Sequence, residues 1–132
     1  FRWKGENVST NELETYFQKF PQIVDALVYG VSVPGNEGKA GMLSVSLNCP
    51  FDPANFEEYN NGLPSYQQPV FIRVIETVAM TETMKYIKKD LKKSAYDIHQ
   101  ISDPIFIKIP KIGYTRLTEQ IYQELLLAKL LT

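Results

Sequence analysis

Cysteine and histidine are almost absent from this chain, and its apolar runs are short. Cys49 is the single cysteine and His99 the single histidine. A lone cysteine cannot form an intramolecular disulfide, and neither residue has a companion at the spacing of metal ligands, so we expect no metal site in this chain and a reducing, cytoplasmic compartment. Each apolar run is far shorter than the roughly 20 residues that cross a bilayer as a helix.

A strong charge of either sign is also lacking. The 14 basic and 15 acidic residues give a net charge of -1, which argues against nucleic acid as a general electrostatic partner. The 132 residues are 44% hydrophobic and 12% aromatic, which suits one soluble globular domain. A chain of this size buries about two-thirds of the surface that it exposes when unfolded. We therefore expect one folded domain with no nucleic-acid partner.

The chain does not begin with methionine. Its first residues, Phe-Arg-Trp, have the character of a strand that is already under way. This start predicts that residues 1–132 are a C-terminal piece of a longer protein.

Hydrophobic periodicity predicts a fold that mixes helices and strands. Apolar residues at spacings of three and four indicate helices over residues 10–20, 53–60 and 87–98 and after Thr118. Alternating or β-branched runs indicate strands over residues 23–33, 40–47, 70–76 and 105–109, and Gly113 is expected to break the chain before the last helix. The predicted fold class is α+β, with a short N-terminal β-hairpin, a small central mixed or antiparallel sheet and flanking helices.

Turn and cap residues support these elements. The hairpin turns at Gly5, where either a positive φ or the close approach of another molecule would require glycine. Ser9 and Glu12 have the spacing of a capping box at the start of the first helix. Asp52 and Thr118 are the predicted N-caps of the second and last helices.

Lys85 is the candidate catalytic residue. It follows the strand over residues 70–76 and precedes the third helix, so we expect it in a short turn from which its ammonium group can be aimed. A fixed compact cation there suits a phosphate on which charge develops. Further along, a cluster of lysines is expected on the solvent side of the third helix, where it could also contact nucleotide phosphates or anionic lipid: Lys88, Lys89, Lys92 and Lys93.

Three stretches resemble one family. Residues 1–10, Phe-Arg-Trp-Lys-Gly-Glu-Asn-Val-Ser-Thr, with Glu-Leu-Glu at 12–14, resemble the start of the small C-terminal domain of adenylate-forming enzymes, in particular the very-long-chain acyl-CoA synthetase and fatty acid transport protein branch. Residues 81–85 are similar to that branch's Thr-Gly-Thr-Phe-Lys, with departures at Glu82 and Met84. Residues 114–122 resemble its closing Tyr-x-x-Leu-Thr-x-x-x-Tyr. The resemblance covers nearly the whole chain.

The resemblance implies that residues 1–132 are the mobile C-terminal lid of a fatty acid–CoA ligase. Such enzymes convert ATP and a fatty acid into an acyl-adenylate and pyrophosphate, and CoA then displaces AMP. The small domain rotates between the two steps, so the implied partner is an N-terminal domain of the same chain that holds the acyl pocket, the phosphate loop and Mg²⁺. The isolated domain is then expected to be inactive. Peripheral contact with a membrane stays open, since its one hint is the apolar last helix, which core packing explains equally well.

The resemblance also implies site residues. Lys85 matches the lysine that meets the adenylate. Gly5 matches the glycine of the pantetheine tunnel for CoA, and its neighbours Glu6 and Asn7 are candidates to contact the pantetheine amides.

Two other functions stay open at this stage. A stand-alone α+β module could bind an anionic partner through its sheet or through the lysines of residues 88–93. An adenylation domain could load the pantetheine of a carrier protein instead of free CoA. The sequence upstream of Phe1 would separate these functions.

Overall fold

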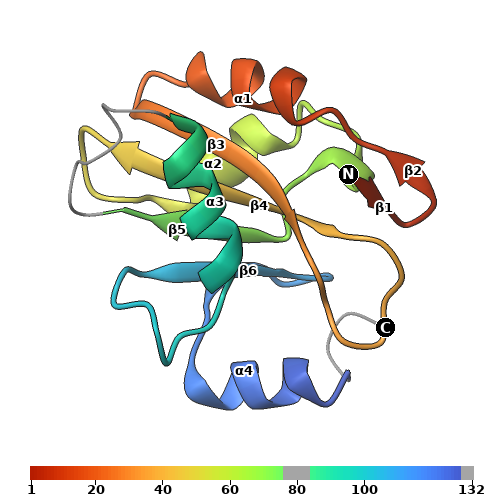
Figure 1. The fold of residues 1–132 in the computed structure, drawn as a ribbon. Coiled ribbons are helices and arrows are strands. Elements are labelled where there is room, and N and C mark those ends of the chain that lie inside the picture. The colour runs from red at the N-terminus through yellow and green to blue at the C-terminus, as the bar shows by residue number, and fades with distance from the viewer. Residues whose placement is uncertain (76–83, 129–132) are drawn as a thin grey trace.

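The computed structural model describes residues 1–75 and 84–128, and for residues 84–87 it describes the backbone alone. A five-stranded sheet lies between two pairs of helices, and a two-stranded hairpin stands at one side (Figure 1). The strands are β1 (Arg2–Trp3), β2 (Glu6–Asn7), β3 (Ile23–Val31), β4 (Ala40–Leu47), β5 (Phe71–Val74), β6 (Ile105–Ile109) and β7 (Gly113–Arg116). The helices are α1 (Thr10–Gln18), α2 (Pro53–Asn60), the 3-10 turn η1 (Ser65–Gln67), α3 (Met84–Ser94) and α4 (Glu119–Leu126).

The main sheet is mixed. Its strand order is β3-β4-β5-β6-β7, with β4 and β5 parallel and the other neighbours antiparallel. A parallel pair needs a long crossover, and α2 with η1 supplies it between β4 and β5. The predicted α+β class, with its hairpin, mixed sheet and flanking helices, is therefore confirmed.

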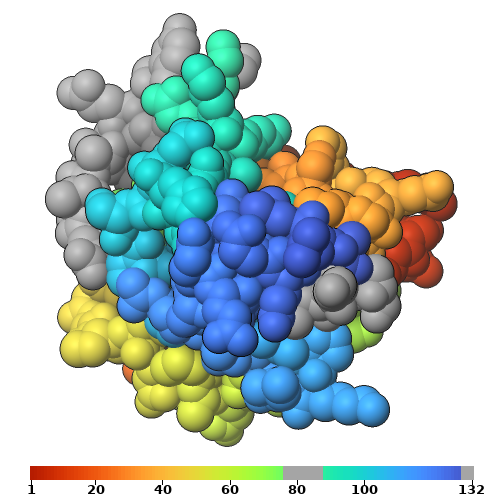
Figure 2. All heavy atoms as spheres, turned by 90° about the horizontal axis from the view of Figure 1, so that it is seen from below, coloured from red at the N-terminus to blue at the C-terminus, as the bar shows by residue number. Residues whose placement is uncertain are grey.

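Each face of the sheet has its own hydrophobic core. On one face, α1 and α2 place Phe17 and Phe56 against strand residues such as Leu43, all at most 2% exposed. On the other face, α3 and α4 cover Tyr29 and Phe71, together with the segment that follows α3. Figure 2 shows this second face, with α4 at its centre and the segment after α3 beside it. Because successive strand residues point to opposite faces, every central strand contributes to both cores.

The predicted N-caps are confirmed. Ser9 Oγ accepts a hydrogen bond from the Glu12 amide at 3.3 Å, and the Asp52 carboxylate accepts one from the Ala54 amide at 3.1 Å. Thr118 Oγ1 caps α4 at 3.3 Å in the same way. The bounds predicted for β4, α2 and β6 agree with the structure.

Several predicted boundaries are wrong, and the strands predicted over residues 23–33 and 70–76 are shorter, at Ile23–Val31 and Phe71–Val74. The first helix ends at Gln18, and residues 19–20 form a turn that still buries Phe20. The third helix ends at Ser94, because Ala95 takes a left-handed φ of 46°, so Ile98 lies beyond the helix although its apolar spacing fits. Gly113 begins a strand that pairs with β6, where the sequence predicted a break.

Side chains cap both edges of the sheet. Along β3, Gln18 accepts from the Ala26 amide at 3.2 Å and donates to the Val24 carbonyl at 2.5 Å. Along β7, the Glu57 carboxylate accepts from the Tyr114 amide at 2.6 Å. These side chains satisfy main-chain groups that would otherwise pair with another strand.

Candidate functional site

Lys85 lies in the first turn of α3, which begins at Met84. The expected position in a turn before the helix is therefore corrected. The side chains of Met84 and Lys85, and all of Glu82, lie outside the described residues. The direction of the Lys85 ammonium group, and the effect of the two departures from the family sequence, stay predictions.

Among the side chains that the structure describes, Lys88 joins the first half of α3 to α1. Lys88 Nζ lies 3.0 Å from Glu14 Oε2 on α1, and the side chains are 24% and 21% exposed. The same carboxylate oxygen accepts a hydrogen bond of 2.8 Å from the Val28 amide on the edge strand β3. Lys88 is thus half-buried and paired, in contrast to the expectation that it lies on the solvent face, whereas Lys89 is exposed as expected.

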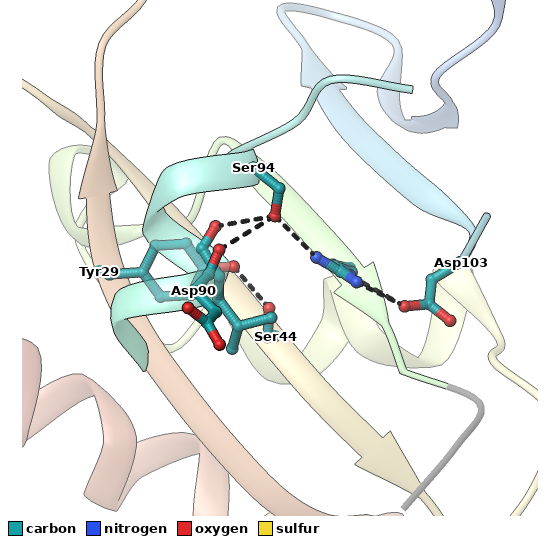
Figure 3. A network of polar contacts seen from close by, with 7 residues as sticks. Tyr29, Ser44, Asp90, Ser94 and Asp103 are labelled. Atoms are coloured by element: carbon teal, nitrogen blue, oxygen red, sulfur yellow. Dashed lines mark hydrogen bonds and ion pairs between the residues drawn. The ribbon is translucent and has the colours of Figure 1, made fainter. Parts of the chain in front are cut away.

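A second network holds the end of α3 (Figure 3). Arg73 on β5 donates to Asp103 Oδ2 from Nε at 3.0 Å and from Nη2 at 2.8 Å. Its Nη1 donates to Ser94 Oγ in the last turn of α3 at 3.3 Å, and Ser94 Oγ in turn donates to the Asp90 carbonyl at 3.2 Å. Arg73 and Asp103 are 16% and 14% exposed. The guanidinium therefore links β5, α3 and the start of β6.

The N-terminal hairpin presents Gly5 at its tip. Lys4 and Gly5 have φ values of 53° and 80°, as in a two-residue turn that needs the left-handed region twice. A Cβ built on Gly5 would meet no heavy atom within 4 Å in the described chain. The positive φ accounts for a glycine here, and the open space above it leaves room for another molecule. The neighbouring Glu6 and Asn7 are both exposed.

The base of the hairpin is anchored against the β3–β4 loop. The Lys39 amide donates to the Arg2 carbonyl at 2.7 Å. A Cβ on Gly38, whose φ is 76°, would lie 2.2 Å from that same carbonyl oxygen. Trp3 pairs with Gly38 and is 5% exposed. The hairpin tip is therefore presented on a rigid base.

A basic depression of about 530 Å³ adjoins the hairpin. Lys4 from the hairpin turn, Lys108 from β6 and Lys111 from the β6–β7 turn line it, with Tyr66 and Gln68 among the other walls. Burial lowers the pKa of Lys108, and Glu57 acts in the opposite direction. Lys108 Nζ donates to Gln68 Oε1, and Lys4 Nζ lies 5.1 Å from the centre of the Trp3 ring. The sequence analysis missed this cluster, because its lysines come from distant segments.

Three other lysines line a different groove. Lys39, Lys92 and Lys93 border a depression of about 700 Å³ where the end of β3, the end of α3 and α4 meet. This groove is where the alternative of an anionic partner would apply. His99 lies beside it, 56% exposed, with Nε2 2.8 Å from Glu119 Oε1.

The described residues, 1–75 and 84–128, offer neither a metal-binding cluster nor a membrane-spanning helix. No cluster of three or more His, Cys, Asp or Glu side chains there is arranged to bind a metal ion. Likewise, none of the helices in that part of the chain has the length and hydropathy to cross a membrane.

The two candidate regions lie apart. In Figure 1 the β1–β2 hairpin stands on one side of the sheet, and the start of α3 lies toward the other side. Within the described chain they are connected through α1, which follows the hairpin and contacts α3 through Glu14.

Curated relatives cover nearly all of this chain. Long-chain fatty acid transport protein 6 of Mus musculus is 42% identical over 131 residues, 96% of this chain and 21% of that protein. Long-chain fatty acid transport protein 3 of Homo sapiens is 38% identical over 134 residues, 98% and 20%. The chain thus spans about a fifth of the length of these relatives. No family model matches it.

Solved structures share the fold. The R395G mutant of coronafacic acid ligase from Pectobacterium brasiliense matches with a TM-score of 0.66 and 14% identity, over 81% of this chain and 21% of that one. A double mutant of o-succinylbenzoate CoA synthetase from Bacillus subtilis, bound to a product analogue, matches with a TM-score of 0.60 and 22% identity, over 72% and 19%.

The fold is that of the C-terminal domain of adenylate-forming enzymes. Within this class, the chain is a homologue of the long-chain fatty acid transport proteins, the very-long-chain acyl-CoA synthetase family. The resemblance of this chain to that branch is thereby confirmed.

Proposed function

We propose that this chain is the mobile lid domain of a long- or very-long-chain fatty acid–CoA ligase. The enzyme joins ATP and a fatty acid into an acyl-adenylate with release of pyrophosphate, and the CoA thiol then displaces AMP to form acyl-CoA. The observation that carries this proposal is the 42% identity to a long-chain fatty acid transport protein over 96% of the chain. The isolated domain lacks the acyl pocket and is inactive.

Lys85 is the adenylation lysine in this proposal. Attack of a fatty acid carboxylate on the α-phosphate of ATP builds negative charge on the phosphate oxygens and on the departing pyrophosphate. A preorganised cation at that point stabilises the transition state, and removing one such group typically costs about 10² to 10³ in rate. A place in the first turn of a helix held to its surroundings suits this role, because a rigid base limits the positions of the amine.

The hairpin serves the second step. The space above Gly5 admits the thin pantetheine arm of CoA, and the exposed Glu6 and Asn7 are placed to contact its amide groups. CoA carries phosphates at its other end. The depression lined by Lys4, Lys108 and Lys111 begins at the residue next to Gly5 and offers positive charge for them.

Several components lie outside this chain in the proposal. The described residues contain no acidic cluster of the kind that Mg²⁺ binds, so Mg²⁺ is assigned with ATP to the N-terminal domain of the same protein. The fatty acid also binds there. The proposed location of the whole enzyme is the cytoplasm, with peripheral contact to a membrane as the source of its substrate.

The test is a pair of half-reaction assays on the full-length protein. Pyrophosphate release is measured across a panel of fatty acids, and thioester formation is measured from supplied acyl-adenylate. Lys85→Ala is expected to abolish the first reaction and spare the second. Equal loss in both half-reactions would refute the role of Lys85, and no pyrophosphate release with any fatty acid would refute the ligase assignment.

A further inference from the structure

We propose that Glu14 is a positioning residue for adenylate formation, acting through Lys88 on the turn of α3 that carries Lys85. The inference rests on the proposed function of Lys85. Glu14 itself touches no substrate in this proposal. It determines where the start of α3 lies, and therefore from which point the Lys85 side chain extends.

The geometry joins three elements at one oxygen atom. Glu14 Oε2 accepts from the Val28 amide at 2.8 Å and from Lys88 Nζ at 3.0 Å. The Val28 amide belongs to the edge strand, which is fixed by its pairing with β4. The carboxylate is therefore held from the sheet side, and it holds α3 in turn. Both charged side chains are about one-fifth to one-quarter exposed, so water screens the pair less than a surface pair.

Lys88 is well placed to act on Lys85. It follows Lys85 by three residues, which is less than one turn and about 4.5 Å along the helix axis. Toward the other end of the helix, Leu91 is 6% exposed in the core and Ser94 is bonded to Arg73. The Lys88–Glu14 pair thus lies nearer to Lys85 along the helix than those later contacts do.

A misplaced catalytic group is costly even when it is chemically intact. A displacement of about 1 Å can lower a rate about 10²-fold. Loss of the pair leaves the Lys85 charge unchanged and widens the range of positions of its helical turn. The effect is expected in the step that uses Lys85, and not in the thioester step, which uses the hairpin.

The experiment uses the full-length enzyme with Glu14→Gln, Lys88→Met and the double variant. Glutamine keeps an oxygen that can accept from the Val28 amide, so Glu14→Gln removes the ion pair and keeps the edge cap. We expect each single variant to lower the rate of adenylate formation about tenfold, with little further loss in the double variant, because the two residues act as a pair. Thioester formation from supplied acyl-adenylate and the midpoint of thermal unfolding are expected to stay near those of the parent enzyme.

Two control variants separate the loss of the ion pair from a general effect of changing a lysine on α3. Lys88→Arg retains the ion pair and is expected to retain most of the rate. Lys89→Met removes an exposed charge from the adjacent position of the same helix and is expected to have no effect on either half-reaction.

Three results would overturn the inference. Equal losses in both half-reactions, or unaltered adenylate formation in Glu14→Gln and Lys88→Met while Lys85→Ala abolishes it, would refute the positioning role alone. Unaltered adenylate formation in Lys85→Ala would refute the proposed function of that lysine, and this inference with it.

Discussion

Tyr16 and Tyr59 each donate their hydroxyl to the main-chain carbonyl of the other. Tyr16 on α1 reaches the Tyr59 carbonyl at 2.6 Å, and Tyr59 on α2 reaches the Tyr16 carbonyl in return. Their ring centres are 4.6 Å apart. The two helices on this face of the sheet are therefore joined by a reciprocal pair of bonds beside the hydrophobic core.

This pair predicts two similar losses of stability. Tyr16→Phe and Tyr59→Phe each remove one hydroxyl and keep the ring, so each is expected to lower the free energy of unfolding by about 1 kcal/mol. Urea denaturation of the chain would measure it. Tyr66→Phe serves as a control for the loss of a hydroxyl on a half-buried tyrosine outside this pair. A change below the error of the measurement in both variants would contradict the importance of the reciprocal bonds.

Substitutions of Gly5 and Gly38 are expected to have opposite effects: the first affects activity and spares the fold, and the second affects the fold. Gly5→Asn adds a side chain where nothing lies within 4 Å, and asparagine tolerates a positive φ better than most residues, so the fold is expected to persist. In the full-length enzyme the same variant is expected to slow thioester formation about tenfold or more and to spare pyrophosphate release, since the side chain obstructs the pantetheine arm. An unchanged rate of thioester formation would count against the tunnel.

Gly38→Ala is expected to act on the fold instead. Its Cβ would lie 2.2 Å from the Arg2 carbonyl oxygen, and its φ of 76° strains any side chain. The hairpin would have to move away from the β3–β4 loop, at a cost of about 1 to 3 kcal/mol. A lowered midpoint of thermal unfolding would confirm this, and an unchanged midpoint would show that the loop adapts freely.

Tyr29 predicts a loss of stability at alkaline pH. Burial raises its pKa to about 12, although the hydrogen bond between Tyr29 and Ser44 and the charge of Arg73 act in the opposite direction. The unfolded chain releases the phenol proton near pH 10, whereas the folded chain keeps it. Stability is therefore unaffected below about pH 9 and falls by up to about 1.4 kcal/mol per pH unit between about pH 10 and 12.

Urea denaturation over this pH range measures that slope, and Tyr29→Phe is expected to reduce it. Burial also raises the pKa of Tyr96, to about 12, and that of Tyr114, so the slope is reduced and not abolished. An identical slope in Tyr29→Phe would mean that Tyr29 ionises in the folded chain as it does in the unfolded one.

Substitution of Arg73 and substitution of its partner Asp103 are both expected to lower stability. Arg73→Met removes both hydrogen bonds to Asp103 and the bond to Ser94, and bonds to charged groups are worth about 2 kcal/mol each. Asp103→Asn keeps the size of the side chain and removes the ion pair. Both variants are expected to lower the free energy of unfolding, by less than additive amounts in the double variant. Full additivity would indicate that the two side chains act independently.

Local signals in the sequence predicted much of the fold. The caps at Ser9, Asp52 and Thr118 involve contacts within three residues, so they can be recognised without knowing the tertiary structure. The end of α3 could not be found in this way, because Ala95 adopts a left-handed φ without being a glycine. Strand β7 has four residues, and its pairing with β6 is what makes it a strand.

The residues of the candidate site also fall into two groups, those that the local sequence predicts and those that only the tertiary structure brings together. Gly5 stands out in the sequence because a hairpin turn needs it, and Lys85 because of the motif around it. The support of α3 was not predictable, since Glu14 and Lys88 are separated by 74 residues and meet only through the packing of α1 and α3 around β3. The lysines beside the hairpin were missed for the same reason.

The capped edges of the sheet have a consequence for the proposed function, in which the domain separates from its neighbour in each catalytic cycle. An edge strand with unpaired main-chain groups would offer them to a strand of another copy of the chain. Along β3 an incoming strand would have to displace Gln18 from two main-chain groups and Glu14 from a third, and along β7 it would have to displace Glu57. Helical side chains thus occupy main-chain groups at both edges of the sheet and oppose the addition of a further strand there.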